Sequence, residues 1–523
     1  MEKETNQGIS LVKKGQKGVL HLVFSRLGLI LLFLVLHLFL LFCGFYWFRE
    51  FLPHIYGGTF LLFSAVMVLS LLNSRMDASV KNTWLLLILL LPIFGALLFW
   101  YTQKDWGHRA LKKRVQQLIS QTKGSIPQSE KVMEKLDREA PEAAALARYL
   151  SGTGCFPAFE NTDVTYFSLG EQMWGQMLLE LEQAKHFIFL EYFIVDEGIM
   201  WGKLLEVLAR KAKEGVQVRV MYDGTCEFST LPHDYPKRLK ELGIQCKMFA
   251  PVKPFLSTHY NFRDHRKIMV IDGHTAFTGG VNLADEYINR RDRFGHWKDV
   301  AVMLKGEAVK SFTLLFLQTW NVEEKKPEFQ RYLDYPAYGP ENAPGYVIPY
   351  GDCPLDRHKV GQRVYMDILN RAKKYVHIMT PYLIMDDEMQ TALKFAAERG
   401  VEVSMILPGN TDNPAAHGLA WTHYASLLDS GVKIYEYTPG FVHAKVFVSD
   451  DLEAVVGTIN LDYRSLYHHF ECAVYMRQTA CIAQIEEDFR KTLAQCAEIT
   501  PQSKIKTSRK LLGWLLKGIA PLM

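Results

Sequence analysis

An eighteen-residue pattern that occurs twice constrains this chain more than any other feature. Each copy reads His-x-Lys, an aspartate seven residues after the histidine, then a glycine and an asparagine. The copies start 178 residues apart. Their key positions are His265, Lys267, Asp272, Gly279, Gly280 and Asn282 in the first copy and His443, Lys445, Asp450, Gly457, Thr458 and Asn460 in the second. Two unrelated surface strands would not match at every key position, so we infer an internal duplication.

The segments around the two copies repeat one order of predicted elements: strand, amphipathic helix, strand. In the first half these elements are predicted at 186–195, 201–215 and 216–224. In the second half the same order returns at 375–384, 388–400 and 401–410. The repeated unit is much longer than the roughly 20–50 residues of solenoid repeats, which favours a duplicated α/β domain. The Pro-rich stretch 327–354 is the predicted seam between the halves.

The residue types in the pattern suit chemistry on a phosphodiester. Residues two apart in a strand point to the same face, so each histidine shares a face with its lysine. A phosphodiester resists attack because its oxygens are anionic, and lysine and asparagine donors can neutralise that charge. One histidine can then attack phosphorus while the other transfers the proton of the departing or incoming alcohol.

Two acids extend the duplication beyond the motif. The segment HWKDVAV, which starts at His296, matches HHFECAV, which starts at His468, and this match makes Asp299 and Glu471 equivalent. A carboxylate beside an imidazole fixes the tautomer of the ring and stabilises its protonated form. We therefore predict that these two acids orient the motif histidines.

With these residues in place, the chain resembles the phospholipase D superfamily, and the stretches LEYFIVDEG, NFRDHRK and TGGVNLADEY are similar to bacterial cardiolipin synthases. The resemblance covers roughly residues 150–490. It implies an α/β fold of two duplicated phospholipase D-like α/β/α sandwich domains related by a pseudo-two-fold, preceded by an N-terminal transmembrane helical anchor. Gly280 and Thr458 depart from the hydroxyl residue and the serine that many members carry there.

The resemblance also implies roles for the motif residues. His265 is expected to be the nucleophile and His443 the acid and base, although the duplication makes the roles nearly symmetric. The implied catalytic residues are His265, Lys267, Asp272, His443, Lys445 and Asp450, with Asn282 and Asn460 binding the substrate phosphate. In the family the motif aspartate is often a structural partner instead. No cofactor and no metal are expected, because the remaining polar candidates, His259, Asp264 and Asp292, are scattered.

The implied reaction is cardiolipin synthesis. One phosphatidylglycerol forms a phosphatidyl-histidine and releases glycerol, and a second phosphatidylglycerol accepts the phosphatidyl group. A phospholipase D that uses water and a phosphatidylserine synthase that uses serine remain alternatives, because the acceptor depends on the shape of the site. A nuclease fits poorly with the net charge of +4. A scaffold without activity would be expected to lose a histidine or lysine from one half, and none is lost.

The amino-terminal region predicts a membrane anchor. Three apolar runs, Leu27–Phe48, Ile55–Leu72 and Trp84–Tyr101, are each about long enough to cross a bilayer, and the last two suggest a hairpin. Basic residues flank both ends of the region, so the number of spans, two or three, stays open. We expect a multi-pass protein of the cell membrane, with its active site at the cytoplasmic face.

These features divide the 523 residues into five predicted segments: an anchor at 1–110, a helical linker at 111–150, domains at 151–330 and 331–495, and a basic amphipathic tail at 496–523. The tail places lysines beside Trp514 and several leucines, as an interfacial helix on anionic lipid would. The eight cysteines lack any regular spacing and indicate no disulfide framework. The expected partners are phosphatidylglycerol and the membrane, without nucleic acid, and the sequence does not indicate an oligomeric state.

Overall fold

The computed structural model of the protein describes residues 8–11, 39, 42, 43, 46, 60–74, 76–90, 95, 96, 98–100, 109–251, 262–340, 342–356 and 358–522. Most of the first apolar run, 27–48, lies outside these residues. The described parts of the other two runs form α4 (Phe60–Leu72) and α5 (Ala78–Leu90), which pack together through Met67, Leu71, Trp84 and Ile88. Among the described residues, no helix combines the length and the apolar character that crossing a bilayer requires.

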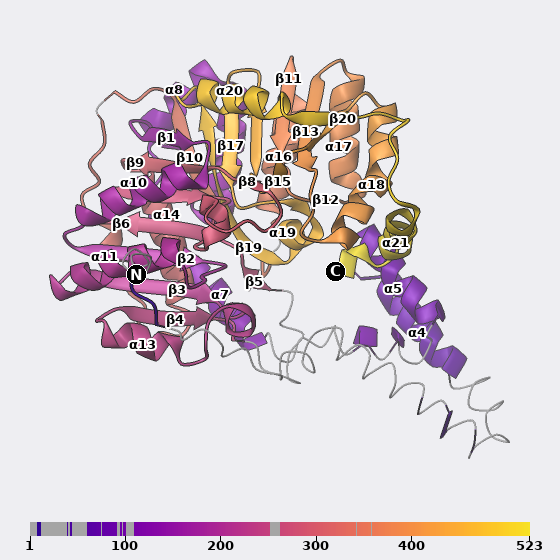
Figure 1. Cartoon of the computed structure of the whole chain (residues 1–523), viewed down its shortest axis with the longest axis horizontal. Helices are drawn as coiled ribbons and strands as arrows, with labels where there is room; N and C mark the ends of the chain where they lie inside the picture. The colour runs from indigo at the N-terminus through magenta and orange to yellow at the C-terminus, as the bar shows by residue number, and fades with distance from the viewer. Residues whose placement is uncertain are drawn as a thin grey trace, which may run out of the picture. The chain divides into compact units, whose positions relative to one another are not determined.

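Residues of the first half build a seven-stranded sheet (Figure 1, left). Its order is β1 (Asp163–Phe167), β9 (Ala301–Lys305), β7 (Thr275–Gly279), β6 (Lys267–Ile271), β2 (Phe187–Tyr192), β3 (Gln217–Asp223) and β4 (Gln245–Phe249). The β2–β3 and β3–β4 pairs are parallel, and the other pairs are antiparallel. The motif strand β6 therefore lies in the middle of the sheet.

The second half repeats this sheet strand for strand. Its order is β10 (Tyr346–Asp352), β19 (His469–Arg477), β17 (Glu453–Gly457), β16 (Val446–Ser449), β11 (Tyr375–Met379), β13 (Glu402–Pro408) and β14 (Lys433–Tyr437), with β20 (Cys496–Ile499) added at the edge. The sense of each pair matches the first sheet. This agreement of order and direction confirms the predicted duplication of an α/β domain.

Helices at equivalent places in the chain lie against the two sheets. The first half contributes α10 (Gly170–Glu182), α11 (Ile199–Lys213), α13 (Tyr235–Glu241) and α14 (Val309–Trp320). The second contributes α16 (Val360–Arg371), α17 (Asp387–Glu398), α18 (Pro414–Asp429) and α20 (Ile482–Leu493). The linker predicted at 111–150 forms α7 (Arg109–Gln121), α8 (Glu130–Glu139) and α9 (Pro141–Gly154). Both halves belong to one compact unit of the chain.

Alternate residues of β2 show how the sheet is buried on both faces. Ile188 and Leu190 join an apolar cluster with the residues of α10 and α11, whereas Phe189 faces the opposite cluster. There its ring stacks on Phe316 of α14, with ring centroids 4.5 Å apart. Because successive side chains of a strand point to opposite faces, a strand covered by helices on both sides is mostly apolar. This is why apolar residues predominate in 186–195, where the buried acid Glu191 forms an ion pair with Arg266 at 3.1 Å.

Candidate active site

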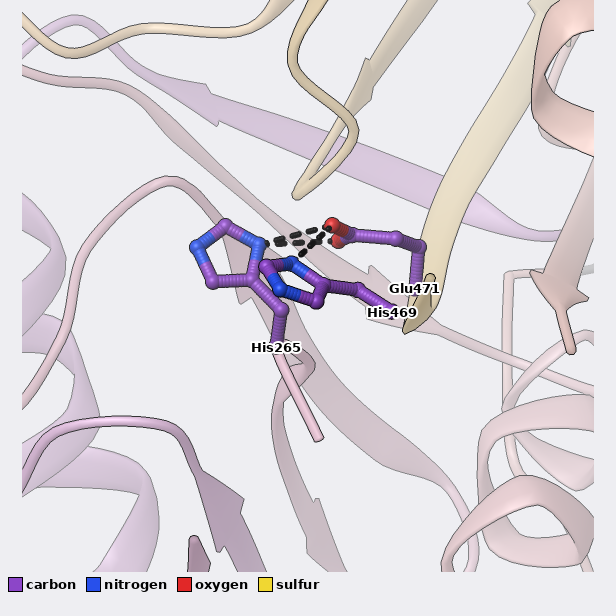
Figure 2. A group of neighbouring side chains, drawn as sticks. All are labelled: His265, His469 and Glu471. Atoms are coloured by element: carbon purple, nitrogen blue, oxygen red, sulfur yellow. Dashed lines mark hydrogen bonds and ion pairs between the residues drawn. The ribbon is translucent and has the colours of Figure 1, made fainter. Parts of the chain in front are cut away.

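A short cross-over brings the first motif histidine to the second half. The strand β5 (Arg263–Asp264) pairs in parallel with the start of β19, and the backbone N–H of His265 donates to the carbonyl of Phe470 at 2.9 Å. This pairing aligns His265 with the next residue on β19, Glu471. The Nδ1 atom of His265 lies 2.9 and 3.0 Å from the two oxygens of the Glu471 carboxylate (Figure 2).

The second motif histidine reaches the first half in the same way. The strand β15 (Gly440–Val442) pairs in parallel with β8 (His296–Lys298), and the N–H of His443 donates to the carbonyl of Lys298 at 2.7 Å. The Nδ1 atom of His443 then lies 2.7 Å from Asp299 Oδ2. Each predicted acid therefore contacts a motif histidine, and in both cases the histidine belongs to the other half of the chain.

The glycine of the motif makes room for these acids. Gly279 ends β7 opposite Ala301 and Gly457 ends β17 opposite Ala473, and each partner lies two residues after an acid, Asp299 or Glu471. A Cβ atom on Gly279 would lie 2.4 Å from the carbonyl oxygen of Val300, and one on Gly457 would lie 2.4 Å from the Cβ of Ala473. Any larger residue would push the two strands apart and move the acid from its histidine.

The two motif lysines lie fully buried beside the histidines. The Nζ atom of Lys445 is 2.8 and 3.0 Å from the two ring nitrogens of His443. The Nζ atom of Lys267 donates to the carbonyl of His265 at 2.6 Å and lies 5.5 Å from the centre of the Phe193 ring. The lysines thus bring two positive charges to the histidines from the two halves.

Burial and these lysines keep both imidazoles neutral. Burial, followed by the charges of Lys267, Lys445 and His443, holds the pKa of His265 well below its usual value. Burial and Lys445 lower the pKa of His443 to about 4, although Asp299 opposes them. Lys445 of the second half thus lowers the pKa of His265, and Lys267 of the first half lowers the pKa of His443. The two histidines and the two lysines therefore form one electrostatic site.

The lysines themselves titrate near neutral pH. Burial lowers the pKa of Lys267 to about 8 and that of Lys445 to about 7. A lysine is charged below its pKa, so the site is most positive below about pH 7 and loses charge as the pH rises through 7 and then 8. We expect kcat/KM to fall at least tenfold per pH unit above pH 7 and at least a hundredfold per pH unit above pH 8, because free enzyme with neutral lysines cannot neutralise the phosphate. Initial rates in mixed micelles from pH 5 to 9.5 check this; a profile that stays level to pH 9.5 would contradict it.

The motif aspartates lie at the opposite end of their strands from the histidines. Asp272 accepts hydrogen bonds from the backbone N–H groups of Lys185, His186 and Phe187 at 2.7–2.8 Å. Asp450 does the same for Lys373, Lys374 and Tyr375 at 2.7–2.9 Å. The carboxylates anchor the start of β2 and β11, which gives Asp272 and Asp450 a structural role, and their direct catalytic role stays a prediction.

Replacing Asp272 with alanine is expected to destabilise the protein by about 3 kcal/mol, because three N–H groups lose a charged acceptor. The turnover of the folded protein is expected to change only a few-fold. Thermal unfolding followed by circular dichroism, and activity per folded molecule at low temperature, measure the two effects separately. If stability is unchanged and activity falls as much as it does when a motif histidine is replaced, the result would support a direct catalytic role for Asp272.

The two motif asparagines border the site but are partly engaged by the protein. The Oδ1 atom of Asn282 accepts from the N–H of Ile194 at 3.0 Å, and its Nδ2 donates to the hydroxyl of Tyr287 at 2.8 Å. The Tyr287 ring in turn lies 5.4 Å from that of His443. The Nδ2 of Asn460 donates to Asp462 at 2.9 Å. Each amide keeps one further N–H, so phosphate binding by Asn282 and Asn460 stays a prediction.

Gly280 and Thr458 differ from the residues that many family members carry at these positions, and the neighbouring acids explain both differences. The hydroxyl of Thr458 donates to the Glu471 carboxylate. At the equivalent Gly280, a Cβ atom would lie 1.9 Å from Asp299 Oδ1. Glycine is needed there because the carboxylate of Asp299 occupies the space of a side chain.

Sequence reasoning missed one buried histidine that borders the site. His469 lies beside His265, with ring centroids 5.3 Å apart, and its Nδ1 is 3.6 Å from Glu471 Oε1 (Figure 2). The matched segments HWKD and HHFE place Trp297 at the equivalent position, and that ring lies 5.5 Å from His443. A comparison of the two segments residue by residue would have drawn attention to this histidine.

The chain is similar to known proteins over most of its length. A family profile described as "Cardiolipin synthase, PLD-like domain" matches residues 177–320 and 365–493, more than half of the chain. The chain belongs to this cardiolipin synthase family. Among its relatives, a cardiolipin synthase of Alkalihalophilus pseudofirmus is 32% identical over 461 residues, which cover 86% of this chain and 90% of that protein.

The chain is also similar to an uncharacterized protein and to one solved structure. A Streptococcus mutans protein, described as uncharacterized, is 55% identical over 458 residues, 87% of this chain and 99% of that one. The crystal structure of phosphatidylserine synthase from Haemophilus influenzae Rd KW20 has a TM-score of 0.54 and 16% identity, and it covers 69% of this chain and 93% of that one, which shows a shared fold. The resemblance to the phospholipase D superfamily is confirmed, and the protein is an enzyme of the phosphatidyltransferase type.

Proposed function

We propose that this protein makes cardiolipin by transferring a phosphatidyl group from one phosphatidylglycerol to another through a phosphatidyl-histidine on His265. The observation that carries the proposal is the pair of cross-over contacts, His265 with Glu471 and His443 with Asp299, beside two buried lysines. A transferase with a covalent intermediate needs one nucleophile and one group that serves first as acid and then as base. Two oriented imidazoles supply both.

The first step forms the covalent intermediate. Glu471 accepts the Nδ1–H of His265, which leaves the lone pair on Nε2 free to attack phosphorus. Lys267 and Lys445 neutralise the phosphate oxygens as the phosphorus–nitrogen bond forms. His443 donates a proton to the glycerol oxygen, and the bond from phosphorus to that oxygen breaks. Glycerol leaves, and the phosphatidyl group stays on His265.

The second step reverses these roles. The terminal hydroxyl of a second phosphatidylglycerol takes the place of glycerol, and His443, now neutral, removes its proton. The oxygen attacks phosphorus, the phosphorus–nitrogen bond breaks, and cardiolipin is released with His265 restored. His443 is neutral in the free protein, and the negative charge of the bound phosphodiester opposes the lysines and raises its proton affinity for the first step.

One assay distinguishes this proposal from the alternatives. Full-length protein in detergent micelles or vesicles is incubated with phosphatidylglycerol carrying a labelled acyl chain, with and without serine. Cardiolipin with an equal amount of glycerol supports the proposal. Phosphatidic acid would indicate a hydrolase, phosphatidylserine a serine-dependent synthase, and the absence of turnover a scaffold.

We further propose that the protein works at the cell membrane, as a multi-pass protein with its active site at the cytoplasmic face. Its lipid substrates and the three apolar runs of the N-terminal region support this placement. The helix α21 (Thr507–Lys517) supports it from the other end of the chain. Its Leu511, Leu512, Trp514 and Leu515 are exposed, and the Nζ atom of Lys510 lies 5.3 Å from the Trp514 ring. Exposed apolar residues beside lysines suit the surface of an anionic bilayer.

A close glycine contact holds this helix with its apolar residues exposed. A Cβ atom on Gly513 would lie 2.2 Å from the carbonyl oxygen of Gly418 in α18. The double change Trp514→Ser and Leu515→Ser should lower activity on vesicles of phosphatidylglycerol several-fold, with little change in detergent micelles, because fewer apolar groups enter the interface. If the double variant is as active as the native protein on vesicles as well as in micelles, the result would argue against a membrane role for α21.

A further inference from the structure

The strongest unassigned feature is a third histidine that converges on the acid of the site. His265, His469 and Glu471 are all buried, and one ligand atom from each lies within 4.8 Å of those of the other two. Figure 2 shows both imidazoles directed at the Glu471 carboxylate. The Nδ1 atoms of His265 and His469 are 2.9 and 3.6 Å from the same oxygen, Glu471 Oε1.

The third histidine is not explained by the transfer reaction. Neither ring nitrogen of His469 makes a hydrogen bond to the residues that the structure describes, and the side chain is 7% exposed. Buried polar groups without hydrogen bonds are uncommon, and each calls for a physical reason. The equivalent residue beside His443 is Trp297, an apolar ring, so the chemistry does not require an imidazole at this position.

We propose that His265, His469 and Glu471 bind a divalent transition metal ion of the zinc class, and that this ion inhibits the enzyme. Two imidazoles and one carboxylate are ligands that Zn²⁺ accepts, with a fourth position left for water. Mg²⁺ and Ca²⁺ prefer sites made of oxygen, so they are not expected here. These three ligands are different residues from His259, Asp264 and Asp292, whose scattered positions in the sequence indicated no metal site.

Inhibition follows from the tautomer of His265. In the metal-free site the proton is on Nδ1 and the lone pair of Nε2 can attack phosphorus. A metal ion on Nδ1 uses the lone pair of that atom, so the single proton of the neutral ring moves to Nε2. Nε2 then has no free lone pair, and Glu471 is held by the metal. This effect on activity rests on the proposed function, whereas binding of the ion does not.

The charges of the site make this binding reversible. Lys267 and Lys445 act on His265 electrostatically and repel a cation, while Glu471 and Asp299 attract it. A site whose positive charges oppose the ion is unsuited to a permanent structural metal. It suits an ion that binds when the substrate phosphate is absent and leaves when chelated or displaced.

Binding is tested directly on the full chain, purified in detergent without a polyhistidine tag. Co²⁺ is titrated into the protein and its visible absorption recorded, and bound Zn²⁺ is counted by elemental analysis after gel filtration. We expect one ion per chain and the spectrum of low-coordinate Co²⁺ with nitrogen ligands. His469→Phe, which replaces the ligand by a ring as the equivalent Trp297 does, should weaken binding by about 10- to 100-fold. His469→Asn gives a second, smaller replacement, and circular dichroism verifies that each variant is folded.

Activity is then measured on the same samples. Zn²⁺ should inhibit cardiolipin formation by the native protein at least about tenfold, and a chelator should restore it. The His469→Phe variant should stay active with Zn²⁺ present. His233→Phe is the matched control, because it removes an exposed histidine that contacts another acid, Glu227, and it should change neither binding nor inhibition.

The outcomes separate the two proposals. Failure to bind an ion, or equal binding by the native protein and both His469 variants, would overturn the metal site whether or not the protein makes cardiolipin. Binding that depends on His469 but leaves activity unchanged would overturn the inhibition. Binding by a protein that turns over no phosphatidylglycerol would support the site and count against the proposed function alone.

Discussion

Replacing His265 with alanine is expected to lower cardiolipin formation by about 10⁴-fold or more, because no other group takes over as the nucleophile. Acid-quenched native protein should carry a labelled phosphatidyl group, and the His265→Ala variant should carry none. A labelled adduct that persists in this variant would show that another residue attacks phosphorus. Phosphatidylglycerol with a radiolabelled phosphate reports both turnover and adduct.

Replacing His443 with alanine should stop turnover as completely but at a different step. A phosphatidyl ester of p-nitrophenol makes the difference visible, because p-nitrophenolate leaves without a proton. The His443→Ala variant should release one equivalent of p-nitrophenolate and accumulate the adduct, since no base activates the acceptor. The His265→Ala variant should release none. A burst from His265→Ala and none from His443→Ala would reverse the two roles.

The second large loss of activity is expected when either orienting acid, Glu471 or Asp299, is replaced by its amide. Glu471→Gln and Asp299→Asn should each lower cardiolipin formation by about 10²- to 10⁴-fold, because an amide keeps the shape of the acid but loses its charge and its hold on the tautomer. Both acids are fully buried, so the amides should remain in place. Thermal unfolding serves as the control for stability.

The step that each change affects tests the cross-over contacts. Glu471 contacts His265, so Glu471→Gln should slow the p-nitrophenolate burst. Asp299 contacts His443, so Asp299→Asn should allow the burst and slow transfer to the acceptor. The opposite pattern would be expected if each acid served the histidine of its own half, and rapid-quench measurements of burst and transfer decide between them.

Much of this site can be inferred from residue order. A strand places side chains two apart on one face, so the pairing of each histidine with its lysine follows from local geometry. The repeated order of strand, helix and strand, the two acids and the buried strands could also be predicted, because each depends on a repeat or a periodicity in the sequence. The contacts of Asp272 could not be predicted from local patterns, because the N–H groups that it binds belong to a segment 85–87 residues earlier in the chain.

The tertiary structure alone decided which acid serves which histidine. His265 contacts an acid 206 residues away and His443 one 144 residues away, because β5 and β15 leave their own halves and pair with strands of the other. It also brought His265 beside His469, which shares a face of β19 with Glu471. A repeat in the sequence determines that two equivalent sets of groups exist; only strand pairing between the halves, which depends on backbone hydrogen bonds at long range, determines how the sets combine.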